Sequence, residues 1–415
     1  MTCPARLWLI SESYFPDEAG TAFYMTRLAE KLAREFTINV LCGYPVYDGR
    51  GSTVGDLEML NGVRIKRCRG TTFNKDVFIL RIVNLVTVSI ATFFNALMGF
   101  GRNDMALVVT NPPLLPFMIK LACWLRGAKC ILRIDDVYPE VLMATGHLSA
   151  ESFAGRVIAH MNNLLYRSVD QIVVLGRDMK ELADNKVGPR GHRAKIIPNW
   201  ADLDEIRPAP KDLNPMLLKT GLVDKFVVLC AGNMGRAQAI ENMLRAVELL
   251  KNRTDIHFLF VGSGAKKRWM QEEAAAKDLR NITFIDQKPR SEQQVFLNAC
   301  DIVLISLLPG MTGAGVPSRL YNAMAAGKPV ISFATSDSEV SRVVYEENIG
   351  WIAGPDDPGA LLEAILNAKS NPERLAEMGR RARMAVENRY SRDFIINEYV
   401  SLLKNLSCGA RSLKS

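Results

Sequence analysis

The sequence predicts an α/β protein with two doubly wound domains, each built on a parallel sheet. Short apolar segments alternate with helical patterns along most of the 415 residues, which is typical of stacked β-α units. The alternation runs twice, and a polar, proline-containing stretch at 201–214 separates the two runs. A chain of this length also favours two domains of roughly 200 residues each.

Each expected strand is a short run rich in Val, Ile, Leu, Cys or Phe that is bounded by polar or turn residues. The expected strands of the first run are 6–11, 37–42, 63–68, 106–110, 130–134 and 171–175. Those of the second run are 226–231, 257–261, 282–285, 302–306 and 330–333. Ligands of doubly wound domains bind beyond the carboxyl ends of the strands, so the chemistry is expected in a cleft between the two sheets.

The composition excludes several classes of protein. With 48% hydrophobic and 23% charged residues, the chain is not expected to be disordered. Its eight cysteines show neither CxxC nor Cys/His spacing, which argues against a disulfide scaffold and a zinc module. The apolar stretch before Ser11 is too short for a secretory signal. We therefore expect a cytoplasmic protein.

A basic surplus lies in the first half of the chain. The net charge is +8, and the surplus concentrates between residues 64 and 81, where six basic residues face only Asp76. The six are Arg64, Lys66, Arg67, Arg69, Lys75 and Arg81. This basic stretch is either a solvated face or a surface for anionic lipid head groups.

An uncharged segment, 82–101, follows the basic stretch. It is long enough for a membrane span, but its Asn, Thr and Ser residues make it a poor one. A span would also put the expected strands at 63–68 and 106–110 on opposite sides of the membrane. We expect a helix that lies partly in the core and partly in the membrane interface, with a second apolar helix at 114–126 that contains Lys120 and Trp124.

The loop after the first strand ends in Gly20 and Thr21, where a helix is expected to begin. A glycine at this point lets an anion approach the backbone N–H groups at the positive end of the helix dipole. Ordinary helix capping is the alternative interpretation.

The loop Gly232–Gln238 directly follows the first strand of the second run. It is not GxGxxG, so a dinucleotide fingerprint is not supported. The order of strand, two glycines, Arg236 and helix still suits a phosphate, which the guanidinium can bind through several N–H groups. A tight turn with a solvated arginine is the alternative.

The segment Gly310–Ile331 is the most specific signal in the chain. It combines a glycine-rich loop, a short helix, a glycine at its end and a strand. The amides at the helix start and Arg319 can hold a diphosphate, and Asn322, one turn further on, can reach a sugar hydroxyl.

Two neighbouring acids, Asp135 and Asp136, follow the expected strand at 130–134. Paired acids at this edge of a sheet can orient an acceptor hydroxyl or take its proton. Helix capping before Pro139 is the alternative.

Asp202 and Asp204 match a DxD metal pattern, but they lie at the expected linker and are interpreted as solvated charge.

Six segments occur in the order seen in family 4 glycosyltransferases, which the chain resembles over essentially its whole length. These segments are Phe15–Thr21, Thr110–Pro113, Asp136–Glu140, Ile197–Asp202, Gly232–Gln238 and Val316–Asn322. The resemblance is greatest to the branch that builds bacterial surface polysaccharides of the O-antigen and colanic-acid type. It implies the GT-B fold, in which two Rossmann-like domains face a cleft. It also implies retention of anomeric configuration without a bound metal or cofactor, because basic side chains and helix amides neutralise the leaving diphosphate.

The resemblance also implies a role for each part of the chain. An acceptor-binding domain is expected at 1–203, a nucleotide-sugar-binding domain at 204–389, and a helix at 390–415 that crosses back to the first domain. The catalytic candidates are Asp135 and Asp136. The donor-binding candidates are Gly20, Thr21, Gly232, Asn233, Gly235, Arg236, Gln238, Gln287, Gly315, Val316, Pro317, Ser318, Arg319, Leu320, Tyr321 and Asn322. Ser338 and Glu339 either face the donor or cap a helix.

The chain departs from the family pattern at several of these positions. Ala314 and Asn322 stand where many family members have glutamates. Asn233 and Gln238 stand where arginine and lysine are usual, so Arg236 and Arg319 are the expected cations. Asp135 stands where relatives often have a histidine, and the four histidines of the chain lie elsewhere in the sequence.

We therefore expect a retaining glycosyltransferase that moves a sugar from a UDP- or GDP-sugar to a lipid-linked saccharide. It would act in bacterial surface polysaccharide synthesis, at the inner face of the cell membrane, with the N-terminal domain on the membrane surface. No nucleic-acid partner is expected. The alternatives are a nucleotide-sugar 2-epimerase of the same fold and a non-catalytic partner subunit, to which the loss of both glutamates points.

Overall fold

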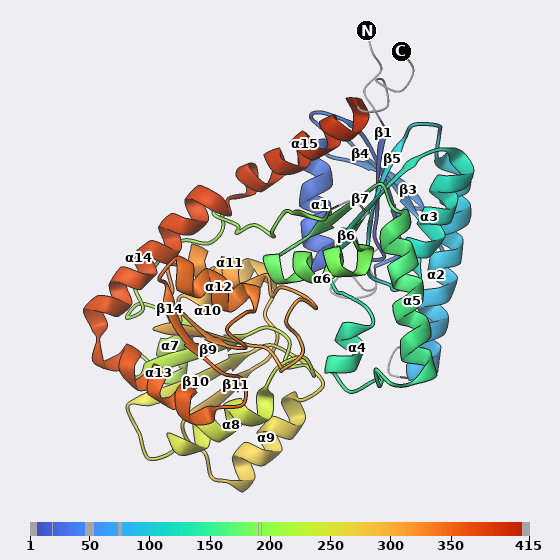
Figure 1. The fold of residues 1–415 in the computed structure, drawn as a ribbon. Coiled ribbons are helices and arrows are strands. Elements are labelled where there is room, and N and C mark those ends of the chain that lie inside the picture. Colours follow the sequence, from blue (N-terminus) through green and yellow to red (C-terminus); the bar gives the residue numbers. More distant parts are fainter. Residues whose placement is uncertain are drawn as a thin grey trace. The chain divides into compact units, whose positions relative to one another are not determined.

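The computed structural model describes residues 6–18, 20–45, 54–73, 77–189, 191 and 193–408 (Figure 1). Lys75 and Asp76 of the basic stretch, and His192, lie outside the described residues. Contacts divide the chain into two compact units. The N-terminal unit comprises Met1–Pro139, Ala150–Pro198 and Ile396–Ser415, and the C-terminal unit comprises Glu140–Ser149 and Asn199–Ile395.

The N-terminal unit is built on an eight-stranded sheet in the order β3-β4-β2-β1-β5-β6-β7-β8. Its strands pair in parallel, except that β3 is antiparallel to β4. The central strand β5 is buried along its whole length, as expected of a parallel sheet covered on both faces. The strands are β1 Arg6–Ile10, β2 Thr37–Cys42, β3 Leu57–Leu60, β4 Val63–Arg67, β5 Met105–Val109, β6 Lys129–Ile134, β7 Gln171–Val174 and β8 Lys195–Ile196.

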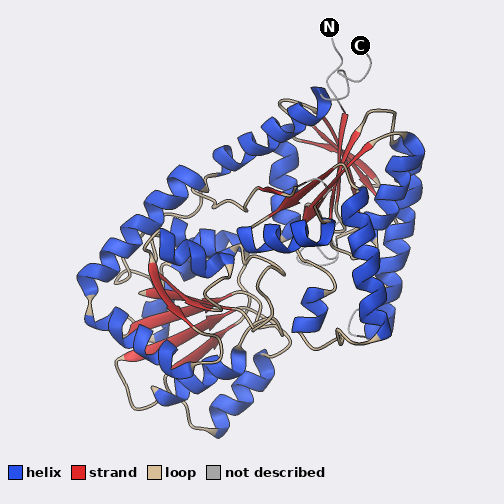
Figure 2. Ribbon diagram, viewed as in Figure 1, coloured by secondary structure: helices blue, strands red, loops and turns tan. Residues whose placement is uncertain are grey.

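Helices cover this sheet, as Figure 2 shows. They are α1 Thr21–Leu32, α2 Phe78–Gly99, α3 Leu115–Arg126, α5 Phe153–Ser168, α6 Arg177–Val187 and the part of α15 (Arg392–Cys408) that starts at Ile396. Local signals fix several ends: Ser152 caps α5 by accepting a hydrogen bond from the Gly155 N–H, and Gly127 ends α3 in a left-handed conformation. The helix α15 is tied to this unit by a hydrogen bond from Arg133 to the Tyr399 hydroxyl, 3.2 Å long.

The C-terminal unit has a six-stranded, wholly parallel sheet in the order β11-β10-β9-β12-β13-β14. The strand order reverses between β9 and β12, which is where ligands of doubly wound sheets bind. The strands are β9 Phe226–Ala231, β10 Ile256–Val261, β11 Ile282–Ile285, β12 Ile302–Ser306, β13 Val330–Phe333 and β14 Gly350–Ala353.

Helices lie on both faces of the second sheet, and two core clusters fill the two interfaces (Figure 2). The helices are α4 Glu140–Ala144, α7 Pro215–Thr220, α8 Ile240–Leu249, α9 Lys267–Ala276, a 3₁₀ turn at Arg290–Glu292, α10 Gln293–Leu297, α11 Arg319–Ala325, α12 Glu339–Glu346, α13 Pro358–Ser370 and α14 Pro372–Arg389. Ser338 caps α12 by accepting a hydrogen bond from Ser341 N–H, which is the capping role expected as one alternative.

The predicted fold class and all eleven predicted strands are confirmed, with ends that differ by one residue at most. Three strands were not predicted: β3, β8 and β14. Each lies at an edge of its sheet, and β8 has only two residues. None of the three is buried along its length, and each is short, so none has the long apolar run that marks a central strand. The edge strand β11 was predicted, because Ile282–Ile285 is mostly apolar.

The long apolar helix α2 connects β4 and β5, two strands of the same sheet. Among the described residues it is the one helix with the length and hydropathy of a membrane span, at Ile79–Gly99 with a mean hydropathy of 1.7, and 28% of the window is buried. One side packs into the unit through Val88, Thr92 and Ala96. The expected helix, part core and part exposed, is therefore present.

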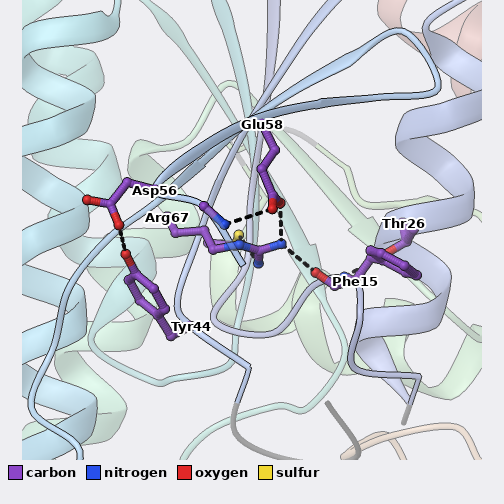
Figure 3. Close-up of polar contacts among 8 residues, drawn as sticks. Phe15, Thr26, Tyr44, Asp56, Glu58 and Arg67 are labelled. Carbon is purple, nitrogen blue, oxygen red and sulfur yellow. Dashed lines mark hydrogen bonds and ion pairs between the residues drawn. The ribbon is translucent and has the colours of Figure 1, made fainter. Parts of the chain in front are cut away.

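The basic stretch is not one continuous exposed surface, which corrects the sequence interpretation. Arg67 is fully buried on β4 and forms an ion pair of 2.9 Å with Glu58 (Figure 3). Its guanidinium also donates to the Phe15 carbonyl at 2.9 Å, and Phe15 N–H donates to the Thr26 hydroxyl at 3.1 Å. Arg67 therefore holds the loop between β1 and α1 in place. Arg69 is exposed and pairs with Asp56.

We predict that Glu58→Ala lowers the free energy of unfolding of the N-terminal unit by about 2 to 3 kcal/mol, because it leaves the buried Arg67 guanidinium without its counter-charge. Urea unfolding followed by hydrogen exchange of β2 and β4 amides measures this unit separately. Asp56→Ala is the matched control, since it breaks the exposed pair with Arg69 and should leave the unfolding midpoint unchanged. Equal effects of both variants would contradict the buried role of Arg67.

Candidate functional site

The loops after β9 and β10 meet at the carboxyl end of the sheet of the C-terminal unit. The loop Gly232–Gln238 follows β9, and its Met234 N–H donates to the Ser263 carbonyl of the loop after β10 at 2.7 Å. Gly262 has φ +151°, and a Cβ atom there would lie 2.0 Å from the Gly232 carbonyl oxygen. Only glycine permits this close approach of the two loops.

Arg319, the first residue of α11, completes a pocket at this edge. The pocket is lined by Cys230, Ala231, Gly232, Met234, Gln238, Phe260, Leu304 and Arg319. Arg319 Nη1 would lie 3.3 Å from a Cβ atom on Gly232, and Arg319 Nη2 donates to the Ser306 carbonyl at 3.2 Å. Arg319 Nε is buried and has no hydrogen-bond partner in the described chain.

No described carboxylate forms an ion pair with Arg319, although its side chain is largely withdrawn from water. Burial lowers the pKa of Arg319 to about 10, and the nearby Cys230 thiol opposes this effect. The guanidinium is therefore a desolvated cation without a protein counter-charge. Such a group binds an anion strongly, because it has already lost much of its hydration.

The remaining residues of the third motif divide into two groups. Asn322 is 6% exposed, and its Oδ1 atom has no hydrogen-bond partner in the described chain. Leu320 and Tyr321 are fully buried in a core cluster, and Tyr321 packs on Tyr390 with ring centroids 4.9 Å apart. Their side chains pack α11 against the core of the C-terminal unit. The segment Gly315–Ser318 forms the approach to α11, and its side chains do not line the pocket.

Gln287 lies beside the same loops. Its Oε1 atom accepts a hydrogen bond of 2.6 Å from the Ser263 hydroxyl. The preceding Asp286 is exposed and forms an ion pair with Lys267, whose hydrogen bond lowers the pKa of the Asp286 carboxyl. The loop at 286–289 is therefore held next to the β9 and β10 loops.

Arg236 has a neighbour that the sequence interpretation missed. Its Nη1 atom lies 3.3 Å from His147 Nε2, and His147 Nδ1 lies 2.9 Å from the Thr145 hydroxyl. The residues 140–149 that follow the Asp136 motif belong to the C-terminal unit. No periodicity or motif in the sequence reveals this change of unit. Gln238 donates to the Asn233 carbonyl, which closes the loop on itself.

In the N-terminal unit, Asp135 lies in a network of buried partners at the carboxyl end of β6. Arg133 Nε donates to Asp135 Oδ1 at 2.9 Å, and the Thr21 hydroxyl donates to Asp135 Oδ2 at 3.0 Å. The Arg133 side chain is 1% exposed and that of Asp135 is 11% exposed. Arg133 also donates to the Tyr399 hydroxyl. Asp135 therefore has a fixed counter-charge and fixed hydrogen bonds.

Asp136 has a different environment from its neighbour. Asn111 Nδ2 donates to Asp136 Oδ2 at 2.8 Å, and the Tyr138 hydroxyl donates to Asn111 Oδ1 at 2.8 Å. Burial raises the pKa of the Asp136 carboxyl, the Asn111 hydrogen bond opposes this rise, and the charge of Asp135 adds to it. A carboxylate with a raised pKa and no cationic partner is suited to accept or share a proton.

Gly20 and Thr21 lie at the start of α1 in the same unit. Gly20 is the N-cap residue, and no atom lies within 4 Å of the position that a Cβ atom would take there. The helix start is thus open in front of Gly20, whereas the Thr21 hydroxyl is engaged by Asp135.

Several residues of these networks belong to no sequence motif that would have predicted their position. Thr110 accepts hydrogen bonds of 3.2 Å from the backbone N–H groups of both Asp135 and Asp136. It follows β5, which pairs with β6, so strand order alone would have placed it here. Arg133 and Tyr399 are far apart in sequence and meet only through the position of α15. No cluster of His, Cys, Asp and Glu that could hold a metal ion occurs among the residues described.

Two family descriptions match the chain, one in each half. Residues 19–200 match the Glycosyl transferase 4-like domain, and residues 219–385 match Glycosyl transferases group 1. WbjE of Pseudomonas aeruginosa, named as a glycosyltransferase, is 32% identical over 408 residues, which are 97% of each chain. WcaI of Escherichia coli K12, named as a colanic acid biosynthesis glycosyl transferase, is 25% identical over 377 residues, covering 87% of this chain and 91% of WcaI.

Solved structures share the fold. Sucrose-phosphate synthase from Thermosynechococcus elongatus superposes with a TM-score of 0.76 at 18% identity, covering 98% of this chain and all of that one. Anabaena Alr3699/HepE, solved in complex with UDP and glucose, superposes with a TM-score of 0.74 at 13% identity, covering 97% of this chain and all of that one.

We predict opposite effects on stability for the two neighbouring acids. The raised pKa of Asp136 means that its contribution to stability is present below the ordinary aspartate pKa of about 3.9 and is lost as the pH rises through its folded-state value. Asp136→Asn should therefore stabilise the N-terminal unit at neutral pH, and the gain should vanish in acid. Asp135→Asn should destabilise it, because Arg133 then lacks its counter-charge.

Urea unfolding at a series of pH values, followed by exchange of β5 and β6 amides, checks both expectations. A loss of stability for Asp136→Asn at neutral pH would show that Asp136 is a structural residue.

Proposed function

The chain belongs to the group 1 glycosyltransferases with the GT-B fold, in the branch that serves bacterial polysaccharide biosynthesis, and from this we propose its donor, acceptor and stereochemistry. The donor is a UDP- or GDP-sugar, which the C-terminal unit binds. The acceptor is a lipid-linked saccharide, which the N-terminal unit binds at the cytoplasmic face of the membrane. The transfer retains the anomeric configuration and requires no metal ion.

Arg319 is the observation that carries the donor site. A nucleoside diphosphate brings two phosphate groups, and the pocket at the end of β9 offers a desolvated cation without a carboxylate partner. The phosphate oxygens would supply the missing counter-charge. Negative charge develops on the diphosphate as its bond to the sugar breaks. A guanidinium in this position neutralises that charge.

Other groups of the C-terminal unit complete the proposed donor site. Arg236 is exposed on the adjoining loop and can reach a phosphate as a second cation. Asn322 offers an unpaired buried Oδ1 atom, which can accept a hydrogen bond from a sugar hydroxyl. The loop that holds Gln287 lies beside Ser263 and can contact the base. Ala314 and Asn322 replace the two acids common in the family, so this site binds its donor with fewer negative charges near the phosphates.

The acceptor side rests on Asp136 of the N-terminal unit. Asp136 can orient an acceptor hydroxyl, because its carboxyl has a raised pKa and accepts a hydrogen bond from the uncharged Asn111 amide. The final proton acceptor in a retaining transfer can be the donor phosphate itself. Asp135 cannot take this role while Arg133 and Thr21 occupy its oxygens. Gly20 and Thr21 stay predicted donor contacts, and the start of α1 is open in front of Gly20.

A transfer assay tests the proposed reaction. The purified protein is incubated with labelled UDP- and GDP-sugars, a chelator and lipid-linked saccharides extracted from bacterial membranes, and the product linkage is determined by NMR. Label in the lipid fraction with the donor's anomeric configuration supports the proposal. An inverted product, or a reaction that stops when the chelator is added, contradicts it. Formation of a free epimeric sugar nucleotide without an acceptor would instead identify an epimerase.

We predict that Arg319→Ala weakens binding of the accepted nucleotide by roughly tenfold to 150-fold, because a charge-assisted contact to phosphate contributes about 1.5 to 3 kcal/mol. Calorimetric titration measures the dissociation constant directly. The matched control is Arg268→Ala, which removes an exposed arginine of the same unit that pairs with Glu272. An unchanged dissociation constant for Arg319→Ala would remove this residue from the donor site.

Asp136→Asn should lower kcat by roughly 100-fold, the usual contribution of a general acid or base, with little change in nucleotide affinity. The side chain belongs to the N-terminal unit, whereas the pocket lined by Arg319 belongs to the C-terminal unit. Steady-state kinetics and calorimetry on the same preparation separate the two quantities. Equal losses in turnover and in nucleotide affinity would indicate that Asp136 acts through the fold.

A further inference from the structure

Thr110–Pro113 is one of the six segments that carry the family resemblance, yet the proposed donor site uses none of its residues. The segment follows β5, whereas the acids Asp135 and Asp136 follow β6. Because β5 and β6 are parallel neighbours, the two segments leave the sheet side by side. The Thr110 hydroxyl accepts hydrogen bonds from the backbone N–H groups of both acids at 3.2 Å. Strand pairing thus brings Asn111 next to Asp136.

Three polar side chains form a chain of hydrogen bonds at this place. The Tyr138 hydroxyl donates to Asn111 Oδ1 at 2.8 Å, and Asn111 Nδ2 donates to Asp136 Oδ2 at 2.8 Å. All three residues belong to the N-terminal unit, and all three are partly buried. The other carboxylate oxygen, Asp136 Oδ1, accepts no hydrogen bond from the part of the chain that the structure describes. One oxygen is therefore held, and the other is available to a ligand.

The chemistry of the groups sets the direction of these bonds. An ionised carboxylate can only accept, so the amide nitrogen must face Asp136 and the amide oxygen must face Tyr138. Burial raises the pKa of the Tyr138 hydroxyl, and the charge of Asp136 adds to this rise. Of the other charged groups near the hydroxyl, Arg81 opposes the rise, and Glu12 and Asp135 increase it. The phenol therefore keeps its proton at neutral pH and remains a donor.

Asp136 depends on the amide because no cation of the described chain forms an ion pair with it. Its neighbour Asp135 pairs with Arg133 at 2.9 Å, whereas the partners of Asp136 are uncharged. Burial raises the pKa of the Asp136 carboxyl, the Asn111 hydrogen bond opposes this rise, and the charge of Asp135 adds to it. Asn111 is thus the group that favours the charged carboxylate, and such a perturbed carboxyl is typical of a functional site.

We propose that Asn111 and Tyr138 are positioning residues for the transfer, which hold Asp136 Oδ2 and leave Asp136 Oδ1 to accept a hydrogen bond from the acceptor hydroxyl. Asn111 acts on Asp136 directly, because it favours the charged form that can only accept. Tyr138 acts through Asn111, because its hydroxyl selects the end of the amide that faces the carboxylate. The inference rests on the role proposed above for Asp136 and names the two residues that maintain this role.

NMR of protein labelled with ¹³C at the aspartate carboxyl groups tests the chain without any substrate. The Asp136 signal is assigned by its loss in Asp136→Asn and is followed as the pH changes. Asn111→Leu should raise the pKa of Asp136 by about one unit, because the charged form loses a hydrogen bond. Tyr138→Phe should raise it by about a third of that amount, since polarisation along a chain changes each bond by about 10 to 30%.

The matched control is Tyr44→Phe, which removes a hydroxyl that donates to Asp56 in the same unit (Figure 3). This variant should leave the pKa of Asp136 unchanged. Kinetics of the transfer give a second readout for Asn111→Leu. We expect kcat to fall roughly tenfold at neutral pH with an unchanged dissociation constant of the nucleotide. The acidic limb of the pH profile of kcat should move to higher pH by the shift that NMR measures.

An unchanged pKa of Asp136 in Asn111→Leu or Tyr138→Phe, or an equal rise in Tyr44→Phe, would overturn the proposal. If Asn111→Leu does not fold, Tyr138→Phe decides, because phenylalanine retains the packing of the ring. A raised pKa with an unchanged pH profile of kcat would refute the positioning role in transfer. Absence of transfer by the wild-type protein would refute the proposed function instead, and the NMR titration would still decide whether the hydrogen-bond chain controls Asp136.

Discussion

A guanidinium without a counter-charge is the feature on which the C-terminal unit depends. Arg319 lies at the edge of a parallel sheet, held by the Ser306 carbonyl and with its Nε atom unpaired. Burial lowers its pKa to about 10, so the protein maintains a charged group in an environment that disfavours charge. Such an arrangement costs stability, and a bound anion would offset that cost. Gly232 lies beside the Arg319 guanidinium, and Gly262 lets the next loop approach the Gly232 carbonyl.

Two adjacent acids of the N-terminal unit, Asp135 and Asp136, have opposite electrostatic environments. Asp135 is neutralised by the buried Arg133, which the Tyr399 hydroxyl of α15 supports in turn. Asp136 is buried against amide groups, with the Asp135 charge beside it, and its pKa is raised. Asp135 therefore has a counter-charge and fixed hydrogen bonds, whereas the raised pKa of Asp136 is the basis for its proposed role with the acceptor. Arg67 has a comparable structural role on the other side of β1, where it holds the Phe15 carbonyl.

The sequence was sufficient for the fold because the central strands are continuous apolar runs. All of the predicted strands were found, and the three missed strands are short and partly exposed, so they lack this pattern. Motif order also selected Arg319, Asp135 and Asp136, whose roles in a site stay predictions. It could not show that Leu320 and Tyr321 turn into the core, since a loop-to-helix motif does not state which helix face is buried.

Contacts between segments that are distant in the chain could not be predicted from the sequence. Arg67 was counted in a basic surface, yet it is buried, because alternate residues of β4 point inward and Glu58 of β3 supplies a counter-charge. His147 meets Arg236 because residues 140–149 pack with the C-terminal unit.

Calorimetric titration of the wild-type protein with UDP and with GDP, in the presence of a chelator, measures the donor site without an acceptor. We expect one of the two nucleotides to bind without metal, because Arg319 and Arg236 supply the positive charge. Binding that requires a divalent cation would contradict this assignment of the charge. Binding of neither nucleotide would contradict the donor site itself and favour a non-catalytic role for the chain.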